Sequence, residues 1–356
     1  MKNDKTIRDE RRRRLDAFDE ILIPHPRLKE IRQRTLDLID DTEAAIKRNE
    51  RSGKALRGGV KVKPEELLVL PIIGPSGATK STSMEEVVAE IGSNPNLEDE
   101  EVPVLHVTLD QNTRGPKQLQ VQILEKFGDP GADSVAKSVQ YSAGVVNESI
   151  REIARRRKTR VIVLDEAGNM LTNAGDGVTK NMAKAIKGLV NQGIFSVILM
   201  GTEEVRRLFA NSELQSRNCG TIDLGAFDIK SKDDRRYFFT FVDDFEKRML
   251  KDGVIDRPLG MVGDVESRAT IYDIAGGIIG IVPRILRQAV DRMASNGRGW
   301  LDWEEDVGPA FHGWNMAQEP ARRHHDPFGE SGAKISTLAF VREDTKAKVK
   351  KSLEDA

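Results

Sequence analysis

The sequence predicts an α/β protein with a doubly wound, five-stranded parallel sheet in a three-layer αβα arrangement, followed by a small helical lobe. Up to about residue 230, short runs of Val, Ile and Leu alternate with amphipathic segments. Strands of a parallel sheet have continuous apolar runs because helices cover both of its faces. From about Ser231 the strand pattern ends, and the remaining apolar residues follow helical spacing.

The five predicted strands lie, in order, in LLVLPIIG, VPVLHVTLD, VIVLDEA, FSVILMGT and TIDLGAF. Helices are expected from about Ser81, over Lys117 to Phe127, Val145 to Arg156 and Thr179 to Val190, and upstream in IPHPRLKEIRQRTLDLIDDTEAAIKR. The pattern predicts a charged, mobile arm over residues 1–22 and an α/β domain with an N-terminal helix over 23–230. A helical lid over 231–313 and a polar, flexible tail over 314–356 complete the expected organisation.

Composition narrows the class of protein more than it narrows the function. The 57 acidic and 56 basic residues nearly cancel, so no global field attracts nucleic acid, although local basic patches remain possible. The single cysteine, Cys219, excludes an internal disulfide, and the five histidines show no zinc-ligand spacing. No run of about 18 apolar residues is present. We therefore expect a soluble, cytoplasmic protein without a membrane partner.

The stretch GPSGATKST follows the first predicted strand and precedes a helix, which is where a phosphate-binding loop is expected. Such a loop needs backbone N–H groups around a phosphate, a lysine for the β and γ oxygens, and a hydroxyl for Mg²⁺. The ATP-binding candidates are Gly74, Pro75, Ser76, Gly77, Ala78, Thr79, Lys80, Ser81 and Thr82. Thr79 departs from the pattern, because a glycine usually precedes the lysine; a Gly/Ser-rich turn is the alternative.

A second element strengthens the interpretation. VIVLDEA places Asp165 and Glu166 at the carboxyl end of an apolar strand, where adjacent carboxylates are costly unless a cation or water uses them. We expect Asp165 and Ser81 to hold Mg²⁺ and Glu166 to polarise the attacking water. A turn or a helix cap is the alternative for such a pair, but the order of the two motifs favours ATP hydrolysis.

Three further residues complete the predicted ATP site. Thr202 ends the fourth strand, where it can orient the water beside Glu166 or cap the next helix. Arg217 precedes the last strand, where it can reach the ATP of a neighbouring subunit or form a salt bridge. Arg284 begins a lid helix and can contact the nucleotide; Arg287 competes for that role, and a solvated face is the alternative for both.

These motifs, in this order, resemble those of AAA+ ATPases over about Ile23 to His312. Within that superfamily the chain resembles the TniB/TnsC-type transposition regulators through IPHPRLKEI, GPSGATKST, TRGPKQLQVQILEKFGDP and VIVLDEAGNM. The most specific match is VILMGTEEVRRLFANSELQSR. The resemblance implies an ATP-dependent regulator that assembles on target DNA as a homo-oligomeric ring or filament. It implies a transposase and a target-selector protein as further partners.

The resemblance also bears on Thr79, because some other AAA+ families carry alanine before the lysine. A non-glycine residue there is compatible with nucleotide binding. A β-branched side chain disfavours positive φ, however, so we expect affinity or hydrolysis to be weakened.

A protein that encircles DNA should present cations at the rim of its channel. Arg114 and Lys117 flank a Gly-Pro pair that favours a helix start, so both cations and helix amides can meet phosphates. Lys180 and Lys184, with Lys187, repeat at helical spacing and form a second candidate. Arg155 to Arg160 is the densest basic run but precedes the third strand, so it ranks lower. Such contacts hold the backbone of double-stranded DNA and predict little sequence preference.

Two alternatives remain open from the sequence. In the first, Thr79 prevents hydrolysis and the protein is an AAA+ scaffold. In the second, the chain is a replication-initiator or helicase-loader ATPase, which would need a DNA-reading domain after the lid; the residues after Trp314 are few and polar for that purpose.

Overall fold

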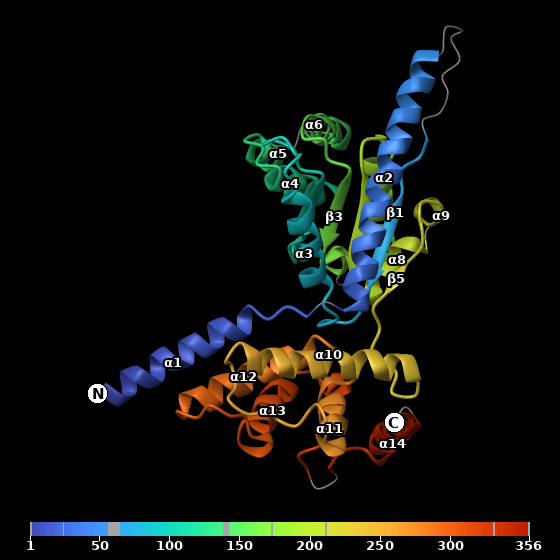
Figure 1. The fold of residues 1–356 in the computed structure, drawn as a ribbon. Helices are drawn as coiled ribbons and strands as arrows, with labels where there is room; N and C mark the ends of the chain where they lie inside the picture. Colours follow the sequence, from blue (N-terminus) through green and yellow to red (C-terminus); the bar gives the residue numbers. More distant parts are fainter. Residues whose placement is uncertain are drawn as a thin grey trace. The chain divides into compact units, whose positions relative to one another are not determined.

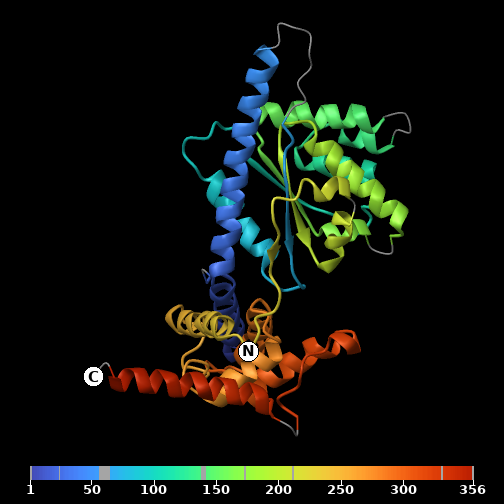
Figure 2. The same ribbon diagram turned by 90° about the vertical axis from the view of Figure 1, so that its right-hand side faces the viewer.

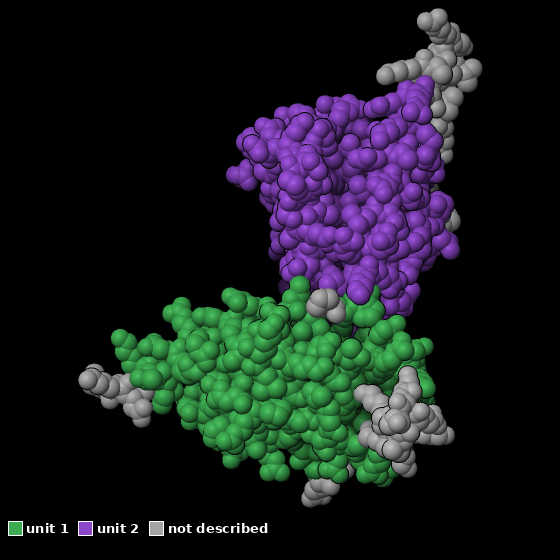
Figure 3. All heavy atoms as spheres, in the orientation of Figure 1, with its two compact units in different colours: residues 1–26, 226–356 green, residues 27–225 purple. Residues whose placement is uncertain are grey.

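The computed structural model describes residues 2–23, 25–55, 65–137, 142–171, 174–210, 212–329 and 332–354. The chain forms two compact units, which Figure 3 shows in different colours. One unit, Arg27–Gly225, is called the α/β unit below. The other, Met1–Pro26 with Ala226–Ala356, is called the helical unit.

The α/β unit is built on a five-stranded parallel sheet, as the sequence predicts. The strand order is β2 (Val104–Thr108), β3 (Val161–Asp165), β4 (Ser196–Gly201), β1 (Val69–Ile73) and β5 (Ile222–Asp223). Every pair is parallel, and the register sets Ile73 beside Gly201 and Asp223, and Thr108 beside Asp165. All the carboxyl ends therefore lie at one edge of the sheet, which we call the carboxyl edge, and the strand starts form the opposite amino edge.

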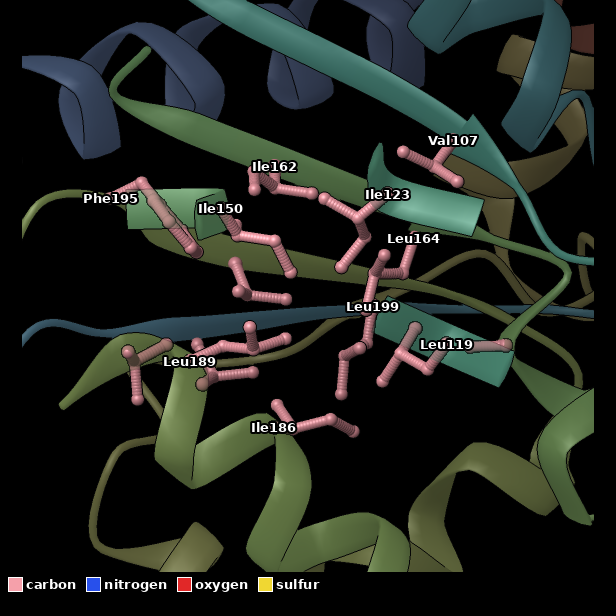
Figure 4. Packing of buried hydrophobic residues seen from close by; sticks show 14 of the residues in the cluster. Val107, Leu119, Ile123, Ile150, Ile162, Leu164, Ile186, Leu189, Phe195 and Leu199 are labelled. Atoms are coloured by element: carbon pink, nitrogen blue, oxygen red, sulfur yellow. The ribbon is translucent and has the colours of Figure 1, made fainter. Parts of the chain in front are cut away.

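Helices cover both faces of the sheet (Figures 1 and 2). Alternate residues along a strand pack into different helical layers. Leu70 and Ile72 of β1 belong to the apolar cluster that includes Leu38 of α2 (Pro26–Ala55) and Met84 of α3 (Lys80–Gly92). Ile162 and Leu164 of β3 point to the other layer, formed by α4 (Pro116–Lys126), α6 (Ala143–Arg156) and α7 (Asp176–Val190). Figure 4 shows this second cluster, with Ile123, Ile150 and Ile186 around Leu199.

Short helices connect the main elements of the α/β unit: α5 (Ala132–Lys137), η1 (Ala167–Leu171), η2 (Glu203–Val205), α8 (Arg206–Phe209) and α9 (Ser212–Gln215). The chain outside the α/β unit contains no strand among its described residues. Its helices are α1 (Lys2–Asp19), α10 (Lys232–Lys251), α11 (Val265–Ala275), α12 (Ile281–Ser295), the π-helix η3 (Trp303–Val307), α13 (Gly308–Met316), η4 (Pro320–Arg322) and α14 (Ile335–Glu354). Among the described helices, none has both the length and the apolar character needed to cross a bilayer.

The amino-terminal segment corrects the expectation of a mobile arm. It forms α1, whose Phe18 is buried in the apolar cluster of the helical unit. Arg14 is 6% exposed and donates hydrogen bonds to the Val254 carbonyl at 2.8 Å and to Asp256 at 3.0 and 3.1 Å. The dense charges of this segment predicted disorder, but Arg14 is paired with residues about 240 positions away. A local sequence pattern does not reveal such pairs.

The carboxyl-terminal segment likewise differs from a flexible tail, because α14 packs on α11. Asp273 of α11 accepts hydrogen bonds from the Lys334 amide at 2.7 Å and the Thr337 hydroxyl at 2.8 Å. Arg235 of α10, 3% exposed, donates to both Asp344 oxygens at 2.9 and 3.0 Å. These polar contacts attach a helix in which eight of the twenty residues are charged.

The Arg235–Asp344 pair provides a test of this attachment. Replacing Arg235 by Gln removes the bidentate pair and leaves the Asp344 carboxylate without its partner, so we expect unfolding stability to fall by about 1.5–3 kcal/mol. Limited proteolysis should also release α14 faster. The control is Arg236→Gln, because Arg236 is exposed on the same helix, where it pairs with Asp233 at 3.7 Å and lies over the Tyr237 ring. Equal proteolysis of the two variants would contradict this attachment.

Candidate functional site

The loop between β1 and α3 is closely packed against the carboxyl edge of the sheet. The Gly74 amide donates to the Gly201 carbonyl at 3.1 Å. A Cβ on Gly74 would lie 2.9 Å from the Leu224 Cβ and 3.0 Å from the Leu224 carbonyl oxygen, so this position has room only for glycine. Gly77 has a φ of 83°, which glycine adopts without strain. The loop therefore has the two glycines where its path demands them.

Thr79 adopts the left-handed conformation that glycine normally supplies at this position. Its φ is 65° and its ψ is 13°, and its hydroxyl donates to the Ala78 carbonyl at 2.6 Å. Left-handed backbone costs an ordinary residue about 1–2 kcal/mol, and a β-branched residue suffers most. The loop thus keeps its path with threonine present, at the expense of local strain.

Lys80 is the first residue of α3 and is 8% exposed. Its ammonium donates to the carbonyl oxygens of Gly74 at 2.8 Å and Pro75 at 2.9 Å. Burial lowers the pKa of Lys80, and the nearby carboxylates of Glu166 and Asp165 act in the opposite direction. The side chain is therefore held over the loop by two neutral acceptors, which an anion can replace with stronger, charge-assisted hydrogen bonds.

Asp165 ends β3 and is 1% exposed. It accepts hydrogen bonds from the Ser81 hydroxyl and the Glu166 amide, and His106 Nε2 lies 3.3 Å from its Oδ2. Burial alone would raise the pKa of Asp165, but these hydrogen bonds, that of His106 foremost, lower it below its usual value. The carboxylate is therefore kept charged beside a hydroxyl at the start of α3.

Glu166 and Thr202 lie on adjoining loops of the same edge. Glu166 is exposed and has a φ of 54°, so the chain turns sharply there and leaves the carboxylate at the surface. Thr202 Oγ1 lies beside Gly168, where a Cβ would be 3.2 Å away. Thr202 precedes η2 but its side chain makes no capping hydrogen bond; it bonds to the Glu204 carboxylate instead. The structure thus brings Lys80, Ser81, Asp165, Glu166 and Thr202 together.

His106 is the residue of this cluster that the sequence predictions miss. It lies on β2 next to β3, and the pairing of Thr108 with Asp165 sets it within reach of the carboxylate. A lone polar residue inside the apolar run VPVLHVTLD is the signal that could have indicated it. The spacing of the histidines along the sequence could not indicate this contact, because the partner of His106 is a carboxylate on the neighbouring strand.

Comparison with known protein families finds a match over part of the chain. Residues 66–209 match the family model of the AAA domain. The chain contains an AAA domain. No curated protein matches the sequence.

Solved structures agree on the fold. The chain resembles the ORC2 protein of Aeropyrum pernix, solved as ADPNP–ADP complexes, with a TM-score of 0.51, 14% identity, and coverage of 86% of this chain and 72% of that one. It also matches Cdc6p of Pyrobaculum aerophilum (TM-score 0.47, 14% identity, 83% and 69% coverage) and the A. pernix ORC1 protein in complex with DNA (0.46, 17%, 77% and 65%). At these identities the likeness concerns the fold alone. The AAA+ fold is supported by the match to ORC2, which has the highest TM-score of the three.

Arg217 is paired within its own chain, and its predicted contact with the ATP of a neighbouring subunit stays a prediction. It is 3% exposed, its Nη2 donates to Asn191 Oδ1 at 2.7 Å, and its Nη1 lies 2.6 Å from Glu66 Oε2. Its carbonyl accepts from the Val69 amide at 2.8 Å, which places it at the amino edge, away from the phosphate loop. The salt-bridge alternative describes Arg217 in this structure, because partners within its own chain already bind the guanidinium.

Arg284 lies in α12 of the helical unit, so its predicted contact with nucleotide stays a prediction. Arg287, its competitor, forms an ion pair with Asp19 at 2.7 Å instead.

The candidate DNA contacts lie on two helices of one layer of the AAA domain. Arg114 is exposed just before α4, and Gly115 occupies the N-cap position of that helix. Lys117 is half-buried and donates to the Ala136 carbonyl at 3.1 Å. Lys180 and Lys184 are exposed on α7. Both helices begin after strands that end at the carboxyl edge, so Arg114 and Lys180 lie toward the same edge.

Replacing Thr79 by Gly tests the strain in the loop. Glycine removes the left-handed penalty but adds freedom to the unfolded chain, so we expect unfolding stability to rise by up to about 1 kcal/mol. The control is Thr82→Gly in the first turn of α3, where the same change should lower stability by about 0.3 kcal/mol. Denaturant unfolding of both variants measures the two changes in stability. A lower stability of Thr79→Gly would contradict the proposal that the backbone at Thr79 is strained.

Proposed function

We propose that the protein binds and hydrolyses ATP with Mg²⁺ at the carboxyl edge of its AAA domain. The observation that carries the proposal is the convergence of Lys80, Asp165 and Thr202, from three separate loops, around the start of α3. A buried lysine, a charged carboxylate and a helix N-terminus are the groups that phosphates and a divalent cation need.

The residues at this edge fit a nucleotide triphosphate. The first amides of α3 are not used by the helix itself, as at every helix start, and they can donate to phosphate oxygens. Lys80 would exchange the carbonyls of Gly74 and Pro75 for the β and γ oxygens. Ser81 and Asp165, already hydrogen-bonded to each other, would hold Mg²⁺, which usually keeps several waters and takes only one or two protein ligands.

When bound, Mg²⁺ neutralises charge that develops on the transferred phosphoryl group. The exposed carboxylate of Glu166 would accept a proton from the attacking water, and Thr202 would orient that water through its hydroxyl. Thr202 first has to leave the Glu204 carboxylate to which it is now bonded. The strained Thr79 precedes the lysine directly, which supports slow turnover rather than loss of binding.

For the biological role, we propose an ATP-switched, DNA-binding regulator of transposition that assembles on target DNA and recruits a transposase. The motif Gly-Thr-Glu-Glu opening at Gly201 and the Ser-Arg pair ending at Arg217 support this role over a generic ATPase. The likeness of the fold to the A. pernix ORC2 protein supports the replication-initiator alternative. The two roles separate by DNA preference, since an initiator selects an origin sequence while the regulator binds backbone phosphates of any duplex.

Variants of two residues test the ATP site. Lys80→Ala should abolish ATP binding, because it removes the buried cation that lies over the loop. Glu166→Gln should keep ATP binding and lower turnover by at least about 100-fold, because the amide cannot accept the proton. Isothermal titration and phosphate release measure the two quantities, with the exposed Glu125→Gln as the control.

Two results would change the conclusion. Turnover in Glu166→Gln equal to that of the unaltered protein would exclude Glu166 as the base. Turnover in the unaltered protein no faster than in Lys80→Ala, with ATP still bound, would favour the scaffold alternative.

Arg114 provides the test of DNA binding. Arg114→Gln should weaken ATP-dependent binding of duplex DNA and reduce the slope of log affinity against log salt by about 1, independent of DNA sequence. The matched control is Lys126→Gln, which removes one positive charge from the exposed far end of α4. Filter binding across a salt series measures both. Equal salt slopes for the two variants would contradict the predicted DNA contact at the start of α4.

A further inference from the structure

We propose that a cavity at the amino edge of the sheet, called the arginine cavity here, binds a phosphate group. The cavity has a volume of about 320 Å³. Its polar lining comes from four parts of the α/β unit: Asn49 and Glu50 of α2, Arg151 and Arg155 of α6, Arg160 before β3, and Gln192 after α7. Three guanidinium groups from two separate segments therefore face one space large enough for a phosphate and part of its ester.

Several of these groups lack a hydrogen-bond partner. In the described part of the chain, Nε of Arg151, Nε of Arg160 and Oε1 of Gln192 are buried without one, as are atoms of Gln120, Thr159 and Arg217 outside the lining. Arg160 Nε lies 3.4 Å from Glu43 Oε1, an ion-pair separation without hydrogen-bond geometry. A buried polar atom left unpaired costs about 1–3 kcal/mol, so these side chains would gain by turning the shielded atoms toward a ligand in the cavity. The Gln192 amide can turn to present its NH₂ group in place of its oxygen.

The charges of the lining favour an anion. Three arginines outnumber the one carboxylate, Glu50, in the lining. Arg151 Nη1 is 3.1 Å from Glu148 and Arg155 Nη1 is 3.3 Å from Glu152, but both pairs are exposed and one helical turn apart. Such pairs contribute only a few tenths of a kcal/mol. Because these pairs are weak, a phosphate can displace them and accept from two guanidinium N–H groups in the bidentate geometry that guanidinium favours.

The arginine cavity is separate from the phosphate loop. Arg160 directly precedes β3, whereas Asp165 ends that strand at the other edge. Five residues at about 3.3 Å each put roughly 16 Å between the two positions. The cavity also gives a role to the basic run Arg155 to Arg160, of which its two end members line the cavity. Arg156, next to Arg155, is exposed and lies outside the lining.

The test compares Arg155→Gln with Arg156→Gln in the full chain. Both changes remove one arginine from α6, and only the first removes a lining residue. Inorganic phosphate and a short DNA duplex are titrated calorimetrically, with ADP in excess so that the phosphate loop is filled. A separate ADP titration reports on that loop and should be equal in both variants. Arg151→Gln is a second variant on the lining, should Arg155→Gln fold poorly.

We expect Arg155→Gln and Arg151→Gln to weaken binding of inorganic phosphate at least tenfold, and Arg156→Gln to leave it within twofold. A parallel loss of duplex affinity identifies the DNA backbone as the source of the phosphate, and unchanged duplex affinity identifies a free phosphate compound. Equal phosphate binding in the lining variants and in Arg156→Gln would overturn the proposal, as would loss of duplex binding alone. Failure to bind ADP would bear only on the ATP site.

Discussion

The hydrogen bond from the Gly74 amide to the Gly201 carbonyl connects the loop after β1 to the end of β4, and the candidate site depends on it. It requires the parallel register that sets Ile73 beside Gly201. This register is enough to place Thr202 next to the loop after β1, without any contact between side chains. Because all five strands are parallel, Asp165 reaches the same edge from β3. One backbone register therefore gathers residues from distant parts of the chain.

Buried cations in this protein differ in what surrounds them, and that difference separates candidate ligand-binding groups from structural ones. Lys80 donates to two neutral carbonyls, which an anion can displace at a gain. Arg217 and Arg235 contact carboxylates of their own chain, so releasing either would leave a buried charge unpaired. The half-buried Arg160 and the buried Arg217 each have a carboxylate nearby and an Nε without a hydrogen-bond partner. Burial alone thus says little until the partners are known.

Thr79 shows how a departure from a motif can be tolerated. The loop conformation is set by Gly74 and Gly77, where contact with Leu224 and a positive φ leave no choice. At Thr79 the surroundings leave room for a side chain. The threonine therefore raises the energy of the backbone without changing the path of the loop. Strain of this kind persists where the neighbouring structure holds the residue in place. A threonine before the lysine is therefore compatible with an intact loop.

The sequence by itself determined the strands, the glycine-containing loop between β1 and α3, and the carboxylates at the end of β3, because local periodicity or short motifs encode each of them. Only the tertiary structure decided the rest. The helices α1 and α14 are ordered by Arg14 and Arg235, whose partners lie about 240 and 109 positions away. Likewise, the pairing of Arg217 and the contact of His106 with Asp165 join separate segments. The sequence does not show whether a charged side chain is solvated by water or paired with a distant residue. The tertiary structure decides this, because folding brings the distant partner close.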